Sequence, residues 1–539
     1  MSNLTVTAVI TDNTPPQWIA DVLNIVSAHP AITLNSIILQ NIPANTPKHP
    51  VPNGLFERLA ESVLYLLVDR SKPKNNVQTP TPLSTSLNAK LVALDEHHSH
   101  ITQTDVILHF GDETSDTDKL PAATHGIWTF KTHTLKPHVE HALLTRAPLL
   151  WVHLWQLPST VKNRQSHTEA RRIGSHSLPT QSFSASGMIN YTFASLPEIM
   201  CSRLNWLANG HDPLHVEQQQ LSTLNSAYPL PTAYSYNRVT GVLYFFKALR
   251  LFWQLIWRRF AGKKSLEQWQ LGFSKRLAHA SDIAVDDYQI VKPAANNIWW
   301  ADPHVLVENG ETHVFFEDMN LNDMVGKIST AVLSENGFTT EPVTALDEPH
   351  HLSYPFVFRH QNTIYMIPET ASRRTVSLYK AVQFPHKWEW VKNLFEDLDA
   401  ADTTVFEHDG RWWMFTNGMS HPEVDERDLL WLYYTDDFDS GQWHPHVLNP
   451  VVTGVDRARM AGNVYLHDGQ LYRPSQYGAT RYGYGVNLSK INTLTTTDYQ
   501  EEVVHRLHPS ASDEWLGCHT AVHSDKFTIV DLLHRTKGN

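Results

Sequence analysis

The sequence has little of several features that would narrow its function at once. It contains only two cysteines among 539 residues, Cys201 and Cys518, so we expect neither a disulfide framework nor a thiolate metal cluster. Its formal net charge of −12 leaves no basic excess to neutralise phosphates, which argues against nucleic acid as a partner. The first residues lack a basic segment followed by an apolar core, and no glycine-rich dinucleotide fingerprint occurs. These absences favour a cytoplasmic protein with no cofactor.

Metal ligands at regular spacing are also missing. The chain has 32 histidines, but they are scattered and none falls in an HExxH or similar arrangement. The run "DEHHSH" at 95–100 offers ligand atoms, yet it is more simply explained as a solvated loop. We therefore expect no metal site.

What is present indicates a folded protein of more than one domain. Apolar residues make up 41% of the chain and charged residues 18%, and 539 residues exceed what one hydrophobic core usually serves. Residues 1–210 alternate short apolar runs such as "LTVTAVITD" and "TDVILHFG" with helical patterns such as "PPQWIADVLNIVSAH". This alternation predicts an α/β doubly wound sheet, whereas the polar stretch 160–187 predicts a loop.

A linker predicted over 211–265 contains one helical segment, "LYFFKALRLFWQLIWRRF" (243–260). Its polar residues recur at steps of three and four: Lys247, Arg250, Gln254 and Arg258. They form one polar stripe on an otherwise apolar helix, and they interrupt it too often for a membrane span. Two interpretations stay open. The helix lies in the membrane interface, which would make the protein peripheral to the inner membrane, or it is clamped between the two domains.

The second half, 266–539, contains a repeat. Five blocks recur at intervals of roughly 50–60 residues, and each has an apolar run, a polar turn often of Asn-Gly or Asp-Gly type, and a second β-rich run. The blocks are "DPHVLVENGETHVFFE" (302–317), "YPFVFRHQNTIYMIPE" (354–369), "DTTVFEHDGRWWMFTN" (402–417), "AGNVYLHDGQLYRPSQ" (461–476) and "CHTAVHSDKFTIVD" (518–531). Further strand-like runs follow most blocks, so the repeat predicts a five-bladed β-propeller. We expect residues 269–293 to supply the outer strands of the last blade; an open β-sandwich with accidental periodicity is the alternative.

Hairpin geometry brings polar residues of different blocks together. The start of the first strand lies beside the end of the second, so both face one rim of the channel if these strands are innermost. The starts are Asp302, Tyr354, Asp402, Ala461 and Cys518, and the ends are Glu317, Glu369, Asn417, Gln476 and Asp531. Crowded carboxylates raise one another's pKa values, which glycosidic bond chemistry uses. The structural alternative is that these side chains cap turns or are solvated at strand ends.

Basic residues near the rim suit an anionic group or sugar hydroxyls. As substrate-binding candidates we select Arg373, Arg457, Arg459 and His519, together with Glu317, Tyr354, Gln476 and Asp531 from the rim. Further basic residues close by are Arg374, Arg473, Arg481 and His534.

The repeat resembles a known family. The segments "WWADPHVLVENGETHVFFED", "HLSYPFVFRHQNTIYMIPET", "DTTVFEHDGRWWMF" and "GNVYLHDGQLYRPSQ" are similar to the propeller domain at the N-terminus of plant glucosamine inositolphosphorylceramide transferases. That domain also occurs in bacterial proteins behind a formyltransferase-like region. The resemblance implies an architecture like that of the five-bladed glycoside hydrolases of family 43. In those enzymes "ADP" of the first blade carries the general base, an Asp of the third blade tunes the pKa and a Glu of the fourth blade is the general acid.

Carried over by position, the resemblance implies that Asp302 is the base and Asp402 the tuning residue. The fourth blade departs from the pattern, because "RMAGNVY" places Ala461, Gly462 and Asn463 where an acid would stand. Glu369, in "IPET", is the nearest substitute acid. The resemblance does not extend to the separate C-terminal domain that catalyses transfer in the plant enzymes, so it does not by itself imply the same reaction.

The first half is weakly similar to the formyltransferase fold, in the order "TDVILHFGD" then "GIWTFKTHT". A working formyltransferase needs an Asn, a His and an Asp gathered at one site, and only His133 stands out as a remnant. The resemblance therefore implies a domain that is degenerate in formyl transfer and retained for binding or scaffolding.

Taken together, the residues and the resemblance favour a carbohydrate-active protein that transfers glycosyl groups in surface glycan or glycolipid biosynthesis. Asp302 would act as base, Asp402 and Glu369 would steady the developing cationic sugar, and Arg457 and Arg459 would bind a phosphate or carboxylate. The expected partner is a sugar or glycolipid. Three alternatives stay open: a family 43-like hydrolase, a non-catalytic glycan-binding propeller and an active formyltransferase.

Overall fold

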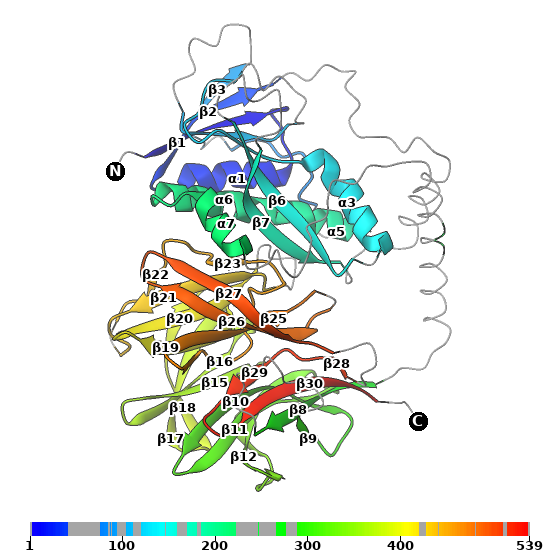
Figure 1. Ribbon diagram of the computed structural model, residues 1–539, viewed down its shortest axis with the longest axis vertical. Helices are drawn as coiled ribbons and strands as arrows, with labels where there is room; N and C mark the ends of the chain where they lie inside the picture. The colour runs from blue at the N-terminus through cyan, green and yellow to red at the C-terminus, as the bar shows by residue number, and fades with distance from the viewer. Residues whose placement is uncertain are drawn as a thin grey trace. The chain divides into compact units, whose positions relative to one another are not determined.

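The computed structural model divides the chain into two compact units, which are described separately (Figure 1). They are Met1–Ala261 with Ser420–Val424, and Gly262–Met419 with Asp425–Asn539. The described residues are 3–40, 76–84, 87, 89–93, 104–111, 120–145, 147–158, 170–180, 185–222, 246, 249, 266–275, 288–419, 427–439, 441–479, 481–509 and 515–536. The "DEHHSH" run lies outside them, as does the predicted helix at 243–260 apart from Phe246 and Leu249, which are helical. Within these ranges, none of the helices combines the length and the apolar character that crossing a membrane requires.

The first unit is built on a seven-stranded sheet with the order β3-β2-β1-β4-β5-β6-β7. Its elements are β1 (Leu4–Ile10), α1 (Gln17–Ala28), β2 (Ile32–Leu39), β3 (Lys90–Ala93), β4 (Val106–His109), β5 (Ile127–Phe130), α3 (Thr132–Thr145), β6 (Leu149–Leu157), β7 (Arg171–Pro179), α5 (Ala185–Ala194), α6 (Leu196–Ala208) and α7 (Pro213–Ser222). Strands β1 to β5 pair in parallel, whereas β6 and β7 are antiparallel. The α/β prediction is confirmed, and the sheet is mixed and mostly parallel.

Both faces of this sheet are covered, which explains its continuous apolar strands. In β1, Ala8 and Ile10 belong to one apolar cluster with Trp18 of α1, whereas Val9 belongs to a second cluster with Ile107 of β4. Alternate residues of one strand therefore serve two cores.

The prediction of a loop over 160–187 is wrong for β7 and for the start of α5. The strand β7 is polar, but its polar groups are buried because they have partners. The Ser175 hydroxyl donates to Glu217 of α7 and lies 3.0 Å from Nδ1 of His153 on β6, while Glu217 also lies 3.5 Å from Arg203. A pattern of apolar residues cannot reveal a strand whose buried polar groups are hydrogen-bonded to side chains of other elements. His133, which the resemblance singles out as a remnant of a formyltransferase site, lies in the first turn of α3.

The second unit is a five-bladed β-propeller, as predicted. The first blade has β10 (Ile298–Glu308), β11 (Glu311–Asn320), β12 (Val325–Ser334), β13 (Gly337–Phe338) and β14 (Val343–Leu346), and the second has β15 (Ser353–His360), β16 (Thr363–Glu369), β17 (Thr375–Gln383) and β18 (Lys387–Glu396). The third has β19 (Ala401–His408), β20 (Arg411–Gly418), β21 (Leu429–Thr435), β22 (His444–Pro445) and β23 (Val452–Thr453), and the fourth has β24 (Tyr465–His467), β25 (Gln470–Tyr477), β26 (Gly485–Leu494) and β27 (Tyr499–Leu507).

The fifth blade closes the ring with strands from both ends of the unit. It joins β28 (Trp515–Gly517), β29 (Ala521–His523) and β30 (Thr528–Thr536) to β8 (Leu266–Ser274) and β9 (Gln289–Val291). In Figure 1 the red β30 runs beside the green β8. The prediction that residues near 269–293 complete the last blade is confirmed.

The hairpin turns confirm the turn chemistry read from the sequence. Positive φ angles occur at both central residues of three turns: Asn309 and Gly310, Asp409 and Gly410, Asp468 and Gly469. This backbone geometry matches the right-handed twist of the flanking strands, and Asn-Gly and Asp-Gly adopt it readily. The turns therefore set the register that brings the start of each first strand beside the end of the second.

A buried ion pair organises the fourth blade. Arg473 is fully buried on β25 and donates to both oxygens of Glu501, at 2.7 and 2.5 Å. The Tyr499 hydroxyl donates to Glu501 at 2.6 Å, and Arg473 also donates to the carbonyl oxygen of Arg457 at 3.0 Å. Arg473 therefore holds the backbone that leads to Arg459. Arg473 itself has no contact with solvent.

We expect Arg473→Ala to reduce the free energy of unfolding by about 3–5 kcal/mol, because it leaves Glu501 buried without its cation. The matched control is Arg411→Ala, which removes a guanidinium from a solvent-exposed pair with Asp436 and should cost below about 1 kcal/mol. Urea unfolding of the two variants measures the difference. Equal losses would contradict the central role of the buried pair.

Candidate active site

The inner strands of the first three blades share one backbone irregularity. Asp302, Tyr354 and Asp402 have φ angles of 48°, 42° and 49°, and each lies where the pairing with the next strand shifts register. A bulge of this kind turns a side chain away from the regular pleat. A non-glycine residue in this left-handed region costs roughly 1–3 kcal/mol, so the surrounding contacts must hold it there.

The predicted neighbours of these positions are in place. The pairs beside the bulges are Ala301 with Glu317, Ser353 with Glu369, and Ala401 with Asn417. The second strands of the second and third blades therefore end beside a bulge, as the hairpin geometry predicts, whereas β11 of the first blade continues past Glu317 to Asn320.

Three of the predicted rim residues also bind the backbone of the following blade; Glu369 and Asn417 lie at or next to a strand end, but Asp531 lies within β30 and not at the end predicted for it. Glu369 accepts the amide hydrogen of Asp402 at 3.4 Å, and Asp531 accepts that of Asp302 at 3.0 Å. Asn417 accepts the amide hydrogen of Met460 at 2.8 Å. Glu369 and Asp531 thereby hold two of the strained positions, Asp402 and Asp302.

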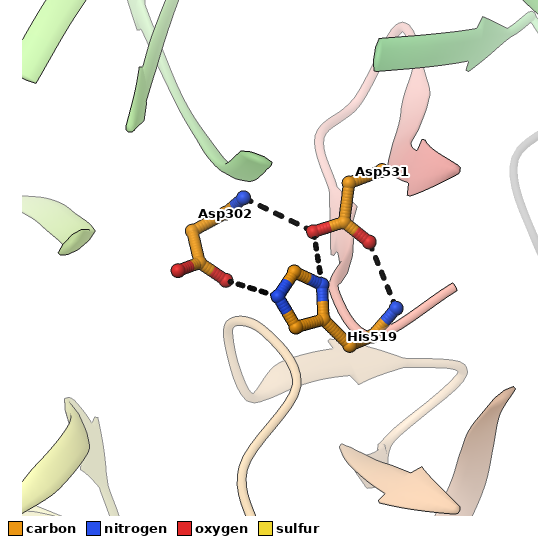
Figure 2. Close-up of side chains that lie close together, drawn as sticks. All are labelled: Asp302, His519 and Asp531. Carbon is orange, nitrogen blue, oxygen red and sulfur yellow. Dashed lines mark hydrogen bonds and ion pairs between the residues drawn. The ribbon is translucent and has the colours of Figure 1, made fainter. Parts of the chain in front are cut away.

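One cluster joins the first and fifth blades through Asp302, His519 and Asp531 (Figure 2). Asp531 accepts the amide hydrogens of His519 and Thr520 at 2.8 and 2.9 Å, and it forms an ion pair with Nδ1 of His519. Nε2 of His519 lies 3.6 Å from Oδ1 of Asp302, and the hydroxyl of Thr520 donates to the same oxygen at 2.8 Å. The imidazole thus lies between two buried carboxylates.

Burial by itself would lower the pKa of His519, but Asp531 and Asp302 outweigh it and raise that pKa to about 9. His519 is therefore a cation at neutral pH. Burial raises the pKa of Asp302; His519 opposes this rise, and the charges of Asp402 and Asp531 add to it.

A second cluster joins the second, third and fourth blades. Nε of Arg459 donates to Oδ2 of Asp402 at 2.6 Å, and Nη2 of Arg459 lies 3.9 Å from Oε2 of Glu369. Burial raises the pKa of Glu369 to about 8, and the charge of Asp402 adds to this rise while Arg459 opposes it. At neutral pH Glu369 therefore holds a proton beside an arginine-bound carboxylate.

Glu317 is a third buried carboxyl group at the mouth. It lies 3.4 Å from Nε2 of His351, and burial together with the charge of Asp302 raises its pKa well above the usual range. Burial lowers the pKa of His351, so this imidazole is neutral at pH 7 and does not compensate a charge on Glu317.

In the fourth blade, Gly462 and Asn463 lie where the resemblance would place an acid, and both residues make structural hydrogen bonds. Both backbone groups of Gly462 bind the hydroxyl of Tyr354: the Gly462 amide donates to it at 2.9 Å, and the hydroxyl donates to the Gly462 carbonyl at 3.2 Å. Asn463 accepts the amide hydrogen of His523 at 2.9 Å. Arg459 is the side chain that this blade contributes to the cluster.

The first cluster also has the composition of a cation site. Asp302, His519 and Asp531 each offer one ligand atom, and these atoms lie within 4.8 Å of one another. A proton on His519 and a divalent cation are alternative ways to neutralise the two carboxylates. Sequence spacing could not reveal this set, because Asp302 and Asp531 are 229 residues apart.

The remaining substrate-binding candidates lie in different surroundings. Gln476 and Arg457 are buried, and the side chain of Tyr354 is fully buried. Arg373 is exposed and ends the 3-10 helix η4 (Ala371–Arg373).

Several residues of the site do not lie at the strand starts and ends from which the sequence predicted the rim. His351 precedes β15, Thr520 lies between β28 and β29, and Tyr482 lies in the loop between β25 and β26. Tyr482 contacts both clusters through Arg459 and His519. Loop residues carry no strand period, so the repeat could not single them out.

The second unit contains a region that matches a known protein family. Residues 285–525 match the family model described as "Glucosamine inositolphosphorylceramide transferase 1, N-terminal". The matched region contains Asp302, Glu369, Asp402, Arg459 and His519, and it ends before Asp531.

Three curated relatives carry the name "Glucosamine inositolphosphorylceramide transferase 1", and two of them illustrate the similarity. The protein from Oryza sativa subsp. japonica is 36% identical over 208 residues, which cover 38% of this chain and 28% of the relative. The protein from Arabidopsis thaliana is 33% identical over 259 residues, which cover 44% of this chain and 33% of the relative. The chain thus spans about a third of the length of these relatives.

Solved structures similar to the chain include two glycoside hydrolases. The catalytic domain of the GH62 α-L-arabinofuranosidase of Coprinopsis cinerea has a TM-score of 0.35 at 12% identity, and the match covers 50% of this chain and 98% of that domain. An exo-1,5-α-L-arabinanase from a bovine ruminal metagenomic library has a TM-score of 0.32 at 13% identity, with 44% and 94% covered.

The raised pKa of His519 links stability to pH. The proton binds more tightly in the folded state, so the stabilising contribution is complete below the ordinary value of 6.5 and is lost as pH rises from 6.5 through about 9. We expect the free energy of unfolding of the wild type to fall over this interval, and to fall less steeply in His519→Gln. Urea unfolding at a series of pH values measures both slopes. His467→Gln, at a partly exposed histidine beside Asp468, is the control and should keep the wild-type slope; equal slopes in His519→Gln and the wild type would refute the linkage.

Proposed function

We propose that the propeller mouth is a carbohydrate active site that transfers a glycosyl group to the hydroxyl of a glycan or glycolipid acceptor. The observation that carries the proposal is the juxtaposition of two carboxyl groups from different blades, one bound by an arginine and the other holding a proton. Asp402 is bound to Arg459, whereas Glu369 beside it has a pKa of about 8 and keeps its proton at neutral pH. Sites in which the surroundings separate the pKa values of two carboxyl groups are typical of glycosidic bond chemistry.

In the proposed reaction, Asp302 takes the proton from the acceptor hydroxyl as the acceptor oxygen bonds to the anomeric carbon of the donor. The bond from the anomeric carbon to the leaving oxygen breaks, and Glu369 gives its proton to that oxygen. The raised pKa of Asp302 makes its carboxylate a better base than an exposed aspartate. His519 and Thr520, which both face Asp302, orient the carboxylate.

Asp402 would stabilise positive charge on the sugar ring in the transition state. Because Arg459 already binds Asp402, a phosphate or carboxylate of the substrate would compete with Asp402 for this guanidinium. Arg457 is buried, so it would reach such a group only after a local movement. We therefore assign Arg459 chiefly to holding the carboxylate of Asp402 in place beside Glu369.

The names of the plant relatives favour a glycolipid acceptor, and the membrane-interface interpretation of the segment 243–260, one of the two left open by the sequence, fits that choice. We propose a scaffolding or binding role for the first unit. A family 43-like hydrolase is the second candidate, because a protonated Glu369 would serve equally well when water replaces the acceptor hydroxyl.

We expect Asp302→Asn and Glu369→Gln each to lower the rate of glycosyl transfer at least ~100-fold, the scale of general acid–base catalysis. Transfer from a panel of sugar nucleotides to extracted glycolipids measures the rate, and release of reducing sugar from aryl glycosides measures hydrolysis. The control Asp409→Asn alters an exposed carboxylate in a hairpin turn and should keep full activity.

The same assays separate the alternatives. Release of reducing sugar that is lost in Asp302→Asn, without transfer, would favour the hydrolase. Sugar binding without turnover in either assay would favour a non-catalytic glycan-binding propeller. Formyl transfer from formyl-tetrahydrofolate to amino sugar nucleotides would assign activity to the first unit.

The protonation of Glu369 also predicts a pH profile. Activity should decline as pH rises through about 8, because the acid form of Glu369 is lost there. The fluoride ion of a glycosyl fluoride donor leaves without needing a proton from the enzyme. With this donor Glu369→Gln should therefore retain most of the wild-type rate, and the decline of activity at alkaline pH should disappear. An unchanged alkaline decline in Glu369→Gln with the fluoride would show that another group is the acid.

A further inference from the structure

We propose that Tyr482 is a substrate-contacting residue whose ring forms the wall on which the sugar packs at the propeller mouth. This inference rests on the proposed function, because it names a further residue of the same site. Tyr482 is not one of the residues that the repeat or the family resemblance identifies.

Tyr482 lies next to both charged clusters yet remains open to solvent. The guanidinium of Arg459 lies over its ring, 5.0 Å from the centroid, and the ring of His519 meets it edge-to-face with centroids 5.5 Å apart. Tyr482 is 46% exposed, whereas Asp302 and Asp402 are 6% and 1% exposed. A ligand that reaches the carboxyl groups from solvent therefore meets the ring of Tyr482 on its way.

The backbone on both sides of Tyr482 is anchored. Arg481 donates to both oxygens of Glu267, at 2.8 and 3.4 Å. Gly483 has a φ of +64° and lies so close to Trp269 that an added Cβ would be 2.9 Å from its Cη2 atom. Trp269 in turn stacks on His519 with centroids 4.2 Å apart. These contacts tie the exposed ring to the first cluster.

The chemistry of an exposed tyrosine here fits a sugar better than an apolar partner. A pyranose offers an apolar face of C–H groups and a rim of hydroxyls, so one face packs on an aromatic ring while carboxylates accept the hydroxyl hydrogens. A docking surface for a protein needs a much larger apolar area than one ring. The large exposed aromatic residue Trp390 lies instead on the outer strand β18 of the second blade, away from the bulges of the inner strands.

The test uses three substitutions at position 482 in the full chain. Tyr482→Phe keeps the aromatic face, Tyr482→Leu keeps apolar cover over Arg459 without that face, and Tyr482→Ala removes both. A panel of methyl glycosides and sugar nucleotides is screened against the wild type by saturation-transfer NMR, and the sugar that binds is then titrated into each variant. Trp390→Ala is the matched control for loss of an exposed aromatic side chain.

We expect Tyr482→Phe and Trp390→Ala to bind with wild-type affinity, and Tyr482→Leu and Tyr482→Ala to bind about tenfold more weakly, the scale of one aromatic contact. Wild-type affinity in Tyr482→Leu would overturn the proposal and leave Tyr482 as a cover that keeps water from the Arg459–Asp402 ion pair. Wild-type affinity in Tyr482→Ala would remove even that role. A panel in which no sugar binds the wild type would contradict this inference together with the proposed function, so the two failures are distinguishable.

Discussion

The pairing of β30 with β8 is the constraint on which the rest of the propeller depends. It runs along the whole of β30, from Thr528 to Thr536, and joins the last strand of the chain to the first strand of the unit. Asp531 lies within this pairing and accepts the amide hydrogen of Asp302 in the neighbouring blade. Closure therefore supplies the contact that holds a strained, positive-φ aspartate in place. An open sheet of the same strands would leave that carboxylate without its support.

The second physical theme is the neutralisation of buried acids. Five carboxyl groups gather at the mouth, on Asp302, Glu317, Glu369, Asp402 and Asp531, and two cations, on Arg459 and His519, lie among them. Burial, to which the charges of neighbouring carboxylates add, raises the pKa values of Asp302, Glu317 and Glu369, so protons neutralise part of this acidic cluster. A site in which one carboxyl group keeps its proton while another can act as a base suits the breaking of a glycosidic bond.

Much of the propeller followed from sequence period, because each blade is specified by short-range rules. Two-residue turns set the hairpin register, and this register together with the bulge in each first strand places Glu369 beside Ser353 and Glu317 beside Ala301. The polar strand β7 was missed for the opposite reason: the buried hydroxyl of Ser175 has its partner, Glu217, on a helix that lies far along the chain. No local pattern contains that information.

The sequence by itself determined the blades, their order and the gathering of acidic strand ends at one rim, since β-pairing has a period of two and turns are local. Only the tertiary structure decided how those acids are paired. Arg459 reaches Asp402 across blades, Tyr354 turns its hydroxyl to Gly462, and Tyr482 stays open beside both clusters. These contacts depend on which loops of different blades meet around the ring. The charge and burial of a site depend on all the residues that surround it in space, and these residues come together only when the ring closes.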